Sequence, residues 1–374
     1  MLKVGIFGGT FDPVHNEHIN LAKIAIEKLS LDKLIVVPTF MPPHKSTTPS
    51  SSQDRLNMLK LAFNGFERVE ISDFEFKSQG TSYTYITIEH FKNTLDAELY
   101  FFVGADMLKD FPSWRYPERI LGNCNLVAFG REDYFVDVEK TLADFKARFN
   151  KTFISLDYEG KDFSSTKIRV YSSLGLDVSG MTTSEVAEYI KTRDLYGGNA
   201  YTDFLKNVLD EKRLIHTAEV AVTAMQKAKE LSLDGRKVMT AALLHDCAKY
   251  IDHTTVSGFS TPDGMPKPVV HAFLGAYVME KVLGIKDEEV IDAVRYHTSG
   301  KANMTTLGKL IFVADMVEPN RDYQGVEKLR ELYKTDFERC FIECVKEETI
   351  HLKNKKQDIY FETLNAYNYY VKED

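Results

Sequence analysis

The pattern of apolar residues changes once along this chain of 374 residues, and the change limits the folds that it can adopt. Before about residue 183, short apolar runs alternate with longer stretches of helical period. After residue 198 nearly every segment has a helical period, and no convincing strand remains. Alternating strands and helices are typical of a parallel sheet with helices on both faces. We therefore expect an α/β Rossmann-like, doubly wound parallel sheet followed by an all-α helical bundle.

The first half contains six short apolar runs that read as buried strands, at Val4–Phe7, Leu34–Val37, Val69–Ile71, Leu99–Val103, Asn125–Phe129 and Phe153–Leu156. Between them lie amphipathic stretches of helical length, at Ile19–Leu29, Gln53–Ala62, Tyr83–Leu95 and Val138–Phe149. In such sheets ligands bind at the carboxyl ends of the strands. This edge is where we expect the first functional site.

A pair of glycines marks the expected boundary between the two halves. Gly197 and Gly198 follow the helix-like run Ser184–Lys191, where a helix stop and a linker are expected. We therefore predict two domains, residues 1–196 and 197–374.

Charge and cysteine usage narrow the class of partner. The 47 Lys and Arg residues against 55 Asp and Glu residues give a formal charge of -8, the wrong sign for binding polynucleotides through overall charge. The four cysteines form no C-x-x-C pair, and no apolar stretch approaches membrane-spanning length. We expect a cytoplasmic protein that binds neither nucleic acid nor membrane. The sequence leaves open whether the chain forms a homodimer.

The first strand runs directly into a glycine-rich turn and then a helix. Glycines there let backbone N–H groups approach a phosphate, and the helix N-terminus favours an anion. His15 and His18 are three residues apart, so both rings can face one ligand from the first helical turn. Taken alone, the two histidines are equally compatible with a capping or packing role.

The motif GGTFDPVHxxH at residues 8–18, together with SSTKIR at 164–169, resembles the HxGH nucleotidyltransferase superfamily. Within it, residues 1–190 resemble bacterial nicotinate-nucleotide adenylyltransferases of the NadD family. The other matching motifs are PPHK at 42–45, SYT at 82–84, GAD at 104–106 and Trp114. The resemblance implies transfer of AMP from Mg²⁺-bound ATP to nicotinate mononucleotide, which gives deamido-NAD and pyrophosphate.

The same resemblance implies roles for individual residues. His15 and His18 would donate to the ATP phosphates in the transition state, while Lys45 and Arg169 would supply positive charge. Trp114 would stack on the nicotinate ring, and the backbone around Tyr83 and Thr84 would read its carboxylate. The other implied ATP contacts are Gly8, Gly9, Thr10, Phe11, Gly104, Asp106, Ser165 and Thr166. The plainer alternatives are a half-buried aromatic for Trp114 and a capping aspartate for Asp106.

One position departs from the family pattern. The third residue of HxGH is usually glycine, and this chain has Glu17. A side chain there could crowd the nucleotide, and its carboxylate would raise the electrostatic cost of nearby phosphates. We therefore expect a Glu17→Gly variant to bind ATP at least as tightly as the parent in an equilibrium titration. Markedly weaker binding would instead show a positive role for Glu17.

Six histidines and aspartates stand beside or within apolar runs of the second half, namely His216, His245, Asp246, His271, His297 and Asp315. An unpaired imidazole or carboxylate is costly to bury, so each must be hydrogen-bonded or bind a metal. One such histidine alone is more often structural. Six of these residues, including an adjacent His-Asp pair, favour a site for iron, manganese or zinc.

The order H…HD…H…H…D resembles HD-domain phosphohydrolases, and Tyr201–Tyr370 closely resembles the YqeK family of symmetrical diadenosine tetraphosphate hydrolases. The resemblance implies a first ion bound by His216, His245, Asp246 and Asp315. It implies that Asp246 bridges to a second ion bound by His271 and His297. Iron is the metal that the resemblance favours. Lys249 and Arg321 are candidate phosphate-binding residues, with an ordinary surface charge as the alternative for each.

The sequence thus predicts a bifunctional enzyme. Its N-terminal domain is expected to be an adenylyltransferase, and its C-terminal domain a metal-dependent hydrolase that yields two ADP. An alternative is that the second domain is a nucleotide sensor that regulates the first. Another is a different substrate: pantetheine phosphate for the N-terminal domain, or another phosphoanhydride or phosphodiester for the C-terminal domain. Trp114 with Ser82–Thr84 favours a nicotinate ring over pantetheine.

Overall fold

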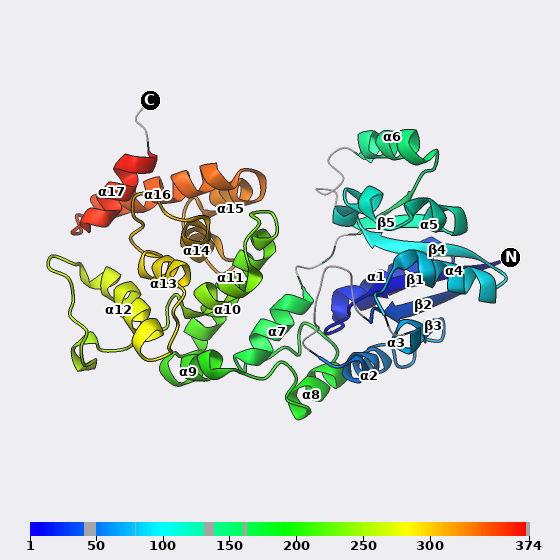
Figure 1. The fold of residues 1–374 in the computed structure, drawn as a ribbon, viewed down its shortest axis with the longest axis horizontal. Coiled ribbons are helices and arrows are strands. Elements are labelled where there is room, and N and C mark those ends of the chain that lie inside the picture. The colour runs from blue at the N-terminus through cyan, green and yellow to red at the C-terminus, as the bar shows by residue number, and fades with distance from the viewer. Residues whose placement is uncertain (41–49, 79, 131–137, 159, 161–162, 372–374) are drawn as a thin grey trace. The chain divides into compact units, whose positions relative to one another are not determined.

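The computed structural model describes residues 1–40, 50–78, 80–130, 138–158, 160 and 163–371. The chain forms two compact units (Figure 1). The first contains Met1–Arg169 and Val178–Tyr196, and the second contains Val170–Asp177 and Gly197–Asp374. The short segment Val170–Asp177 thus packs with the helical unit although it precedes residue 197. The functional limits 1–196 and 197–374 stay a prediction.

The first unit is built on one six-stranded sheet of order β3-β2-β1-β4-β5-β6. Every pair of neighbouring strands is parallel. The strands are β1 (Leu2–Gly9), β2 (Lys33–Pro38), β3 (Val69–Ile71), β4 (Ala97–Gly104), β5 (Asn125–Gly130) and β6 (Ile154–Asp157). The predicted Rossmann-like sheet is confirmed. The strand order reverses between β1 and β4, which is where ligands bind in such sheets.

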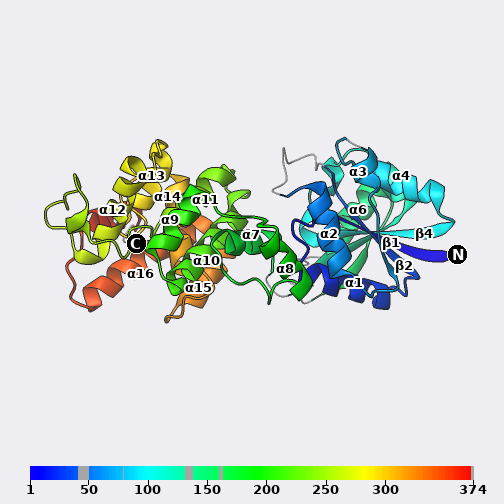
Figure 2. The same ribbon diagram turned by 90° about the horizontal axis from the view of Figure 1, so that it is seen from below.

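Helices cover both faces of this sheet, with α1 and α4 on opposite sides (Figure 2). One face packs against α4, α5 and α6 through a cluster that includes Ile6, Leu99, Ile88 and Phe145. The helices of the unit are α1 (Asn16–Lys28), α2 (Ser52–Ala62), α3 (Phe74–Ser78), α4 (Thr84–Thr94), α5 (Pro117–Asn123), α6 (Val138–Phe149) and α8 (Ser184–Thr192). The sequence did not indicate α3 and α5, because helices of one or two turns show no readable period. Two short 3₁₀ helices, η1 (Ala105–Leu108) and η2 (Phe111–Ser113), follow β4, and α7 (Ser165–Ser173) follows β6.

A fully buried arginine on α2 holds the carboxyl ends of β1 and β2 together. Arg55 is 0% exposed, and its Nη1 donates to the carbonyl oxygens of Thr10 at 3.0 Å and Thr39 at 2.6 Å. Its Nη2 donates to the Phe40 carbonyl at 3.4 Å. The guanidinium therefore satisfies backbone acceptors at the edge where a ligand would bind.

We expect Arg55→Met to lower the free energy of unfolding of the first unit by about 3 kcal/mol, because the carbonyls of Thr10 and Thr39 lose their donor in a buried place. Trp114 is the only tryptophan of the chain and lies in this unit, so its fluorescence during urea unfolding reports this unit alone. Arg68→Met is the control, because Arg68 is exposed. A change no larger in Arg55→Met than in this control would contradict the role.

The regular structure in the described part of the second unit is entirely helical, as predicted. Its helices are α9 (Ala200–Val208), α10 (Glu211–Ala228), α11 (Gly235–Leu244), α12 (Lys267–Lys281), α13 (Glu288–Arg295), α14 (Thr306–Val317), α15 (Val326–Thr335), α16 (Phe337–Asn354) and α17 (Phe361–Tyr370), with the 3₁₀ helix η4 (His253–Thr255) before α12. Side-chain caps fix several starts: Asp210 accepts the Arg213 N–H and Thr305 accepts the Gly308 N–H. Among the described helices, none is both long and apolar enough to cross a membrane.

Candidate active sites

The glycine-rich turn lies at the carboxyl end of β1 and leads into α1. A Cβ on Gly9 would approach the Phe11 ring to 2.9 Å, so any other residue there would require this buried ring to move. His15 is the N-cap of α1, and His18 lies in its first turn. The two rings stack with centroids 3.7 Å apart and an interplanar angle of 30°. The structure thus brings both histidines together at the helix N-terminus.

Burial keeps this histidine pair neutral. It lowers the pKa of His15 to about 4, and it lowers that of His18 well below the ordinary value, with further help from His15. His18 Nδ1 accepts the backbone N–H of His15 at 3.2 Å. This bond leaves the ring proton on Nε2, which is the nitrogen available to donate to a ligand.

Arg169, Ser165 and Thr166 of α7 face this turn from the other side. Arg169 donates to the Asp12 carbonyl through Nη1 at 2.6 Å and to Thr166 Oγ1 through Nη2 at 3.0 Å. A cavity of about 230 Å³ lies here, lined by Thr10, Phe11, Asp12, His18, Ser165, Thr166 and Arg169. Two helix N-termini, a neutral imidazole donor and a guanidinium thus surround one small polar cavity, an arrangement suited to phosphate oxygens.

Glu17 is buried and is not among the residues that line this cavity. Its Oε2 accepts a hydrogen bond from Tyr158 Oη, and its Oε1 lies 3.4 Å from the donor Asn20 Nδ2. A Cβ on Gly160 would approach Glu17 Oε2 to 2.5 Å. The carboxylate therefore contacts the segment after β6.

The remaining ring-binding candidates lie beside α4 and η2. Tyr83 is the N-cap of α4, and its side chain makes no capping hydrogen bond among the described residues. Trp114 packs on Phe111 at 5.2 Å, and the neighbouring Arg115 stacks on Tyr83 at 4.7 Å. Gly104 ends β4 and precedes η1, which contains Asp106. Lys45 lies outside the described residues.

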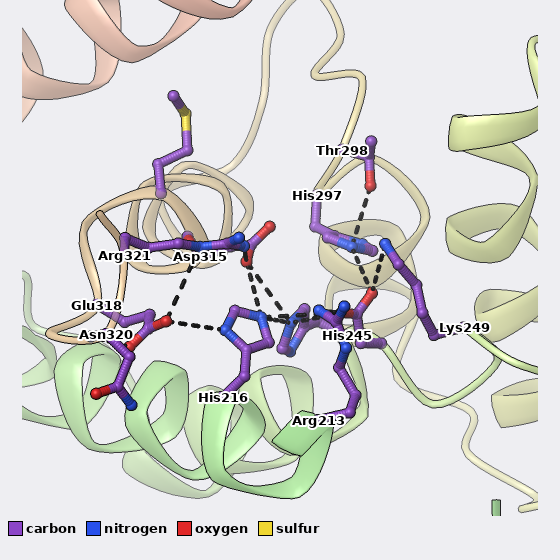
Figure 3. Close-up of polar contacts among 12 residues, drawn as sticks. Arg213, His216, His245, Lys249, His297, Thr298, Asp315, Glu318, Asn320 and Arg321 are labelled. Carbon is purple, nitrogen blue, oxygen red and sulfur yellow. Dashed lines mark hydrogen bonds and ion pairs between the residues drawn. The ribbon is translucent and has the colours of Figure 1, made fainter. Parts of the chain in front are cut away.

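In the second unit, residues from five parts of the helical bundle meet in one cluster, and Figure 3 shows part of it. His216 lies on α10, Asp315 on α14 and His271 on α12, while the other three follow helices: His245 and Asp246 follow α11, and His297 follows α13. Their ligand atoms form the sets His216–His245–Asp246, His245–His297–Asp315 and Asp246–His271–His297, each with its atoms within 4.8 Å of one another.

Asp246 lies between the two groups of histidines. Its Oδ2 is 3.8 Å from His216 Nε2 and 3.6 Å from His245 Nε2. Its Oδ1 is 3.0 Å from His271 Nε2 and 3.6 Å from His297 Nε2. Asp315 Oδ1 completes the first group, 3.0 Å from His216 Nε2. One carboxylate thus faces each histidine pair with a different oxygen, as a bridging ligand does.

The histidine nitrogens are arranged as in a metal centre. Nδ1 of His245 and of His297 each lie 2.7 Å from a backbone carbonyl, of Ala242 and Val294 respectively. These acceptors keep the proton on Nδ1 and leave the Nε2 lone pair free. The Nε2 atoms then face one another, 3.3 Å apart in the pair His216–His245 and in the pair His271–His297. A proton or a divalent cation between two such nitrogens offsets the repulsion of their lone pairs, and a donor set of imidazoles and carboxylates fits a divalent metal site.

The charges of the cluster are strongly coupled. Burial lowers the pKa of His245 to about 3 and is the main cause of the lowered pKa of His271. Although burial would raise the pKa of Asp246, the surrounding histidines and Lys249 hold it well below the ordinary value. Burial would likewise lower the pKa of His216, but hydrogen bonds to Asp315 and Glu318 raise it overall. The centre therefore presents ionised carboxylates and mainly neutral imidazoles, the protonation states that metal ligands need.

Family models match both halves of the chain: Cytidylyltransferase-like at residues 6–170 and HD domain at residues 213–320. The chain is 30% identical over 354 residues to the probable nicotinate-nucleotide adenylyltransferase/Ap4A hydrolase of Mycoplasma genitalium, covering 91% of this chain and 96% of that protein. The chain belongs to this family of fused proteins. The Mycoplasma pneumoniae protein of the same description is 31% identical over 85% of this chain and 89% of its own length.

Among solved structures, the chain is similar to a predicted HD superfamily hydrolase involved in NAD metabolism from Clostridium acetobutylicum. The identity is 32%, the match covers 46% of this chain and 95% of that one, and the TM-score is 0.42. The HD-domain match at 213–320 contains all six candidate metal ligands, from His216 to Asp315.

Three charged residues surround the cluster, and sequence reasoning singled out only two of them. Lys249 Nζ lies 3.5 Å from Asp246 Oδ1 and 3.1 Å from His271 Nε2. Arg321 pairs with Asp315 Oδ1 and donates through Nε to the Asp315 carbonyl at 2.6 Å, so in the free protein it orients that carboxylate. Arg213, which the sequence analysis did not indicate, donates from Nη1 to Asp246 Oδ2 at 2.8 Å. Arg213 lies three residues before His216, so the two can share a helix face. A single arginine on a helix is too common, however, for this spacing to predict a role.

Sequence reasoning also missed Glu318, which is 2% exposed and lies 3.0 Å from His216 Nδ1 through Oε1. We expect Glu318→Gln to weaken divalent-metal binding about 10–100-fold, because the neutral amide no longer raises the basicity of His216. Titration of the metal-free protein against a chelator of known affinity measures this effect. Glu331→Gln, at an exposed position on α15, is the control. Equal metal affinity in the two variants would contradict the role of Glu318.

Proposed function

We propose that the chain catalyses two reactions on adenine nucleotides. The first unit transfers AMP from ATP to nicotinate mononucleotide and releases pyrophosphate. The second hydrolyses diadenosine tetraphosphate symmetrically to two ADP. Each proposal rests on one observation together with the family: the stacked His15–His18 pair facing Arg169 for the first, and the six-residue cluster shared by Asp246 for the second.

In the first reaction the phosphate of nicotinate mononucleotide attacks the α-phosphorus of ATP in line. The P–O bond to pyrophosphate breaks, and no covalent intermediate with the protein is needed. The His18 Nε2–H and the Arg169 guanidinium donate to the phosphate oxygens, where negative charge grows in the transition state. Mg²⁺ bound to ATP would neutralise negative charge on the departing pyrophosphate. Trp114 and the first turn of α4 hold the nicotinate ring and its carboxylate, which orients the attacking phosphate.

In the second reaction, residues on both sides of the Asp246 carboxylate would bind the phosphates of the substrate. Two divalent ions, iron by family resemblance or manganese or zinc, would supply an activated water and neutralise the phosphates when bound to the histidines and aspartates of the cluster. Arg213 lies on the Oδ2 side of Asp246 and Lys249 on the Oδ1 side. One positively charged side chain is therefore available on each side of the P–O–P link that is cut. Arg321 keeps Asp315 oriented throughout.

Separate assays test the two halves. The protein is incubated with nicotinate mononucleotide and Mg-ATP, and separately with diadenosine tetraphosphate and iron or manganese. We expect deamido-NAD in the first assay and two ADP per substrate in the second. Absence of deamido-NAD would refute the adenylyl transfer proposed for the first unit. Products other than ADP in the second assay would refute the symmetrical cleavage.

These substrates and the four free cysteines favour the reducing cytoplasm as the site of action.

A further inference from the structure

A second cavity, of about 340 Å³, lies in the helical unit beside the metal cluster. Its walls come from the start of α12, the end of α16 and the segment that leads into α17. Its lining includes Lys267, Thr298, Glu348, Lys356, Asp358 and Tyr360, together with Leu352. We call it the α12–α16 cavity.

Thr298 connects this cavity to the cluster. It lines the cavity, and its Oγ1 lies 3.1 Å from His297 Nε2 (Figure 3). The same Oγ1 lies 3.3 Å from His271 Nε2. Val269, another lining residue, is two positions before His271 on α12. A ligand in the cavity therefore lies one side chain away from the Oδ1 side of Asp246.

The lining combines two lysines, the carboxyl groups of Glu348 and Asp358, and apolar surface. Lys267 and Lys356 are exposed, and neither forms an ion pair with any described residue. Glu348 is half-buried, and burial raises the pKa of its carboxyl group. Leu352 and the buried Tyr360 supply apolar wall. Ammonium groups suit phosphates, while a carboxyl group and an apolar wall suit the amino or hydroxyl groups and the flat face of a nucleoside.

Size limits what the cavity can hold. Small-molecule sites usually measure roughly 300–1,000 Å³, so this cavity is at the small end and suits one nucleoside with its phosphates rather than two. Symmetrical cleavage needs the central P–O–P link at the cluster and one nucleoside diphosphate on each side. We propose that the α12–α16 cavity binds one nucleoside diphosphate half of the dinucleoside substrate, on the Oδ1 side of Asp246. This inference rests on the hydrolase function proposed above.

Two variants of the full chain test the cavity. Leu352→Trp narrows it, and Lys356→Glu reverses one charge, while Lys286→Glu makes the same change at an exposed position outside it. We expect the first two to raise KM for diadenosine tetraphosphate about tenfold and the control to change it less than about twofold. Metal content should stay at the parent's value in all three. In Leu352→Trp the inhibition constant of inorganic tripolyphosphate should also stay unchanged, because that probe has no nucleoside. KM values of both cavity variants within about twofold of the parent would overturn the proposal.

Photo-crosslinking with 8-azido-ADP gives a second readout that does not depend on hydrolysis. We expect labelled peptides from residues 266–269 or 348–363, in addition to any from the first unit, and a loss of this label in Leu352→Trp. Label confined to other peptides would overturn the cavity assignment. A parent protein that hydrolyses no diadenosine tetraphosphate yet labels these peptides would refute the hydrolase function and leave the nucleotide site standing.

Discussion

Asp246→Asn should lower the hydrolysis of diadenosine tetraphosphate by roughly 10³-fold or more. Among the residues that the structure describes, Asp246 is the only one whose two oxygens face both histidine pairs, 3.0 Å from His271 Nε2 on one side and 3.6 Å from His245 Nε2 on the other. An amide presents one oxygen and one N–H donor, so it cannot serve as an anionic ligand on both sides. It also leaves Arg213 and Lys249 without their buried counter-charge. Elemental analysis of the purified variant should show loss of bound metal alongside the loss of activity.

Asp322→Asn is the matched control, because Asp322 is exposed in the same unit. It should hydrolyse at the parent's rate. In both variants adenylyl transfer should be unchanged, because the first unit has its own nucleotide site. Unchanged hydrolysis in Asp246→Asn would exclude the cluster as the catalytic centre. A changed adenylyl transfer rate instead would favour a nucleotide sensor in the second unit.

His18→Ala should lower kcat for adenylyl transfer about 10²–10³-fold, the usual effect of removing one preorganised donor from a developing charge. The structure fixes this ring by the 3.2 Å bond from the His15 N–H and by its 4.9 Å contact with Phe11. The donor is thus in place before ATP binds. KM for ATP should change less than kcat, because the bond strengthens in the transition state.

His18→Asn and His90→Ala are the comparison variants for this experiment. Asparagine can accept from the His15 N–H and still offer an N–H donor, so it should retain part of the activity. His90 stacks on Phe74 at 3.8 Å, away from the turn, and its loss should leave kcat unchanged. A His18→Ala enzyme with kcat within about threefold of the parent would show that His18 only packs the turn.

Much of the fold could be predicted, because the pattern of apolar residues within each segment indicated the strands and the longer helices. All six predicted strands lie within or overlap observed ones, and Val138–Phe149 matches α6 at both ends. Short helices such as α3 have no readable period and were missed. The segment Val170–Asp177 packs with the helical unit although its sequence neighbours belong to the first. No local sequence pattern indicates the unit with which this segment packs, because that depends on the surface that the segment contacts in the folded chain.

For the sites, the sequence by itself indicated which residues we propose to carry the chemistry, because buried histidines and aspartates are too costly to keep without partners or metal. It placed His15 and His18 on one helical turn and singled out the six residues that meet in the cluster. Only the tertiary structure decided how they face one another. The split of the Asp246 oxygens between two histidine pairs, the buried support from Glu318 and the approach of Arg213 depend on the packing of α10, α11, α12 and α14. Side-chain direction across helices distant in sequence is set by that packing, and a one-dimensional pattern does not contain it.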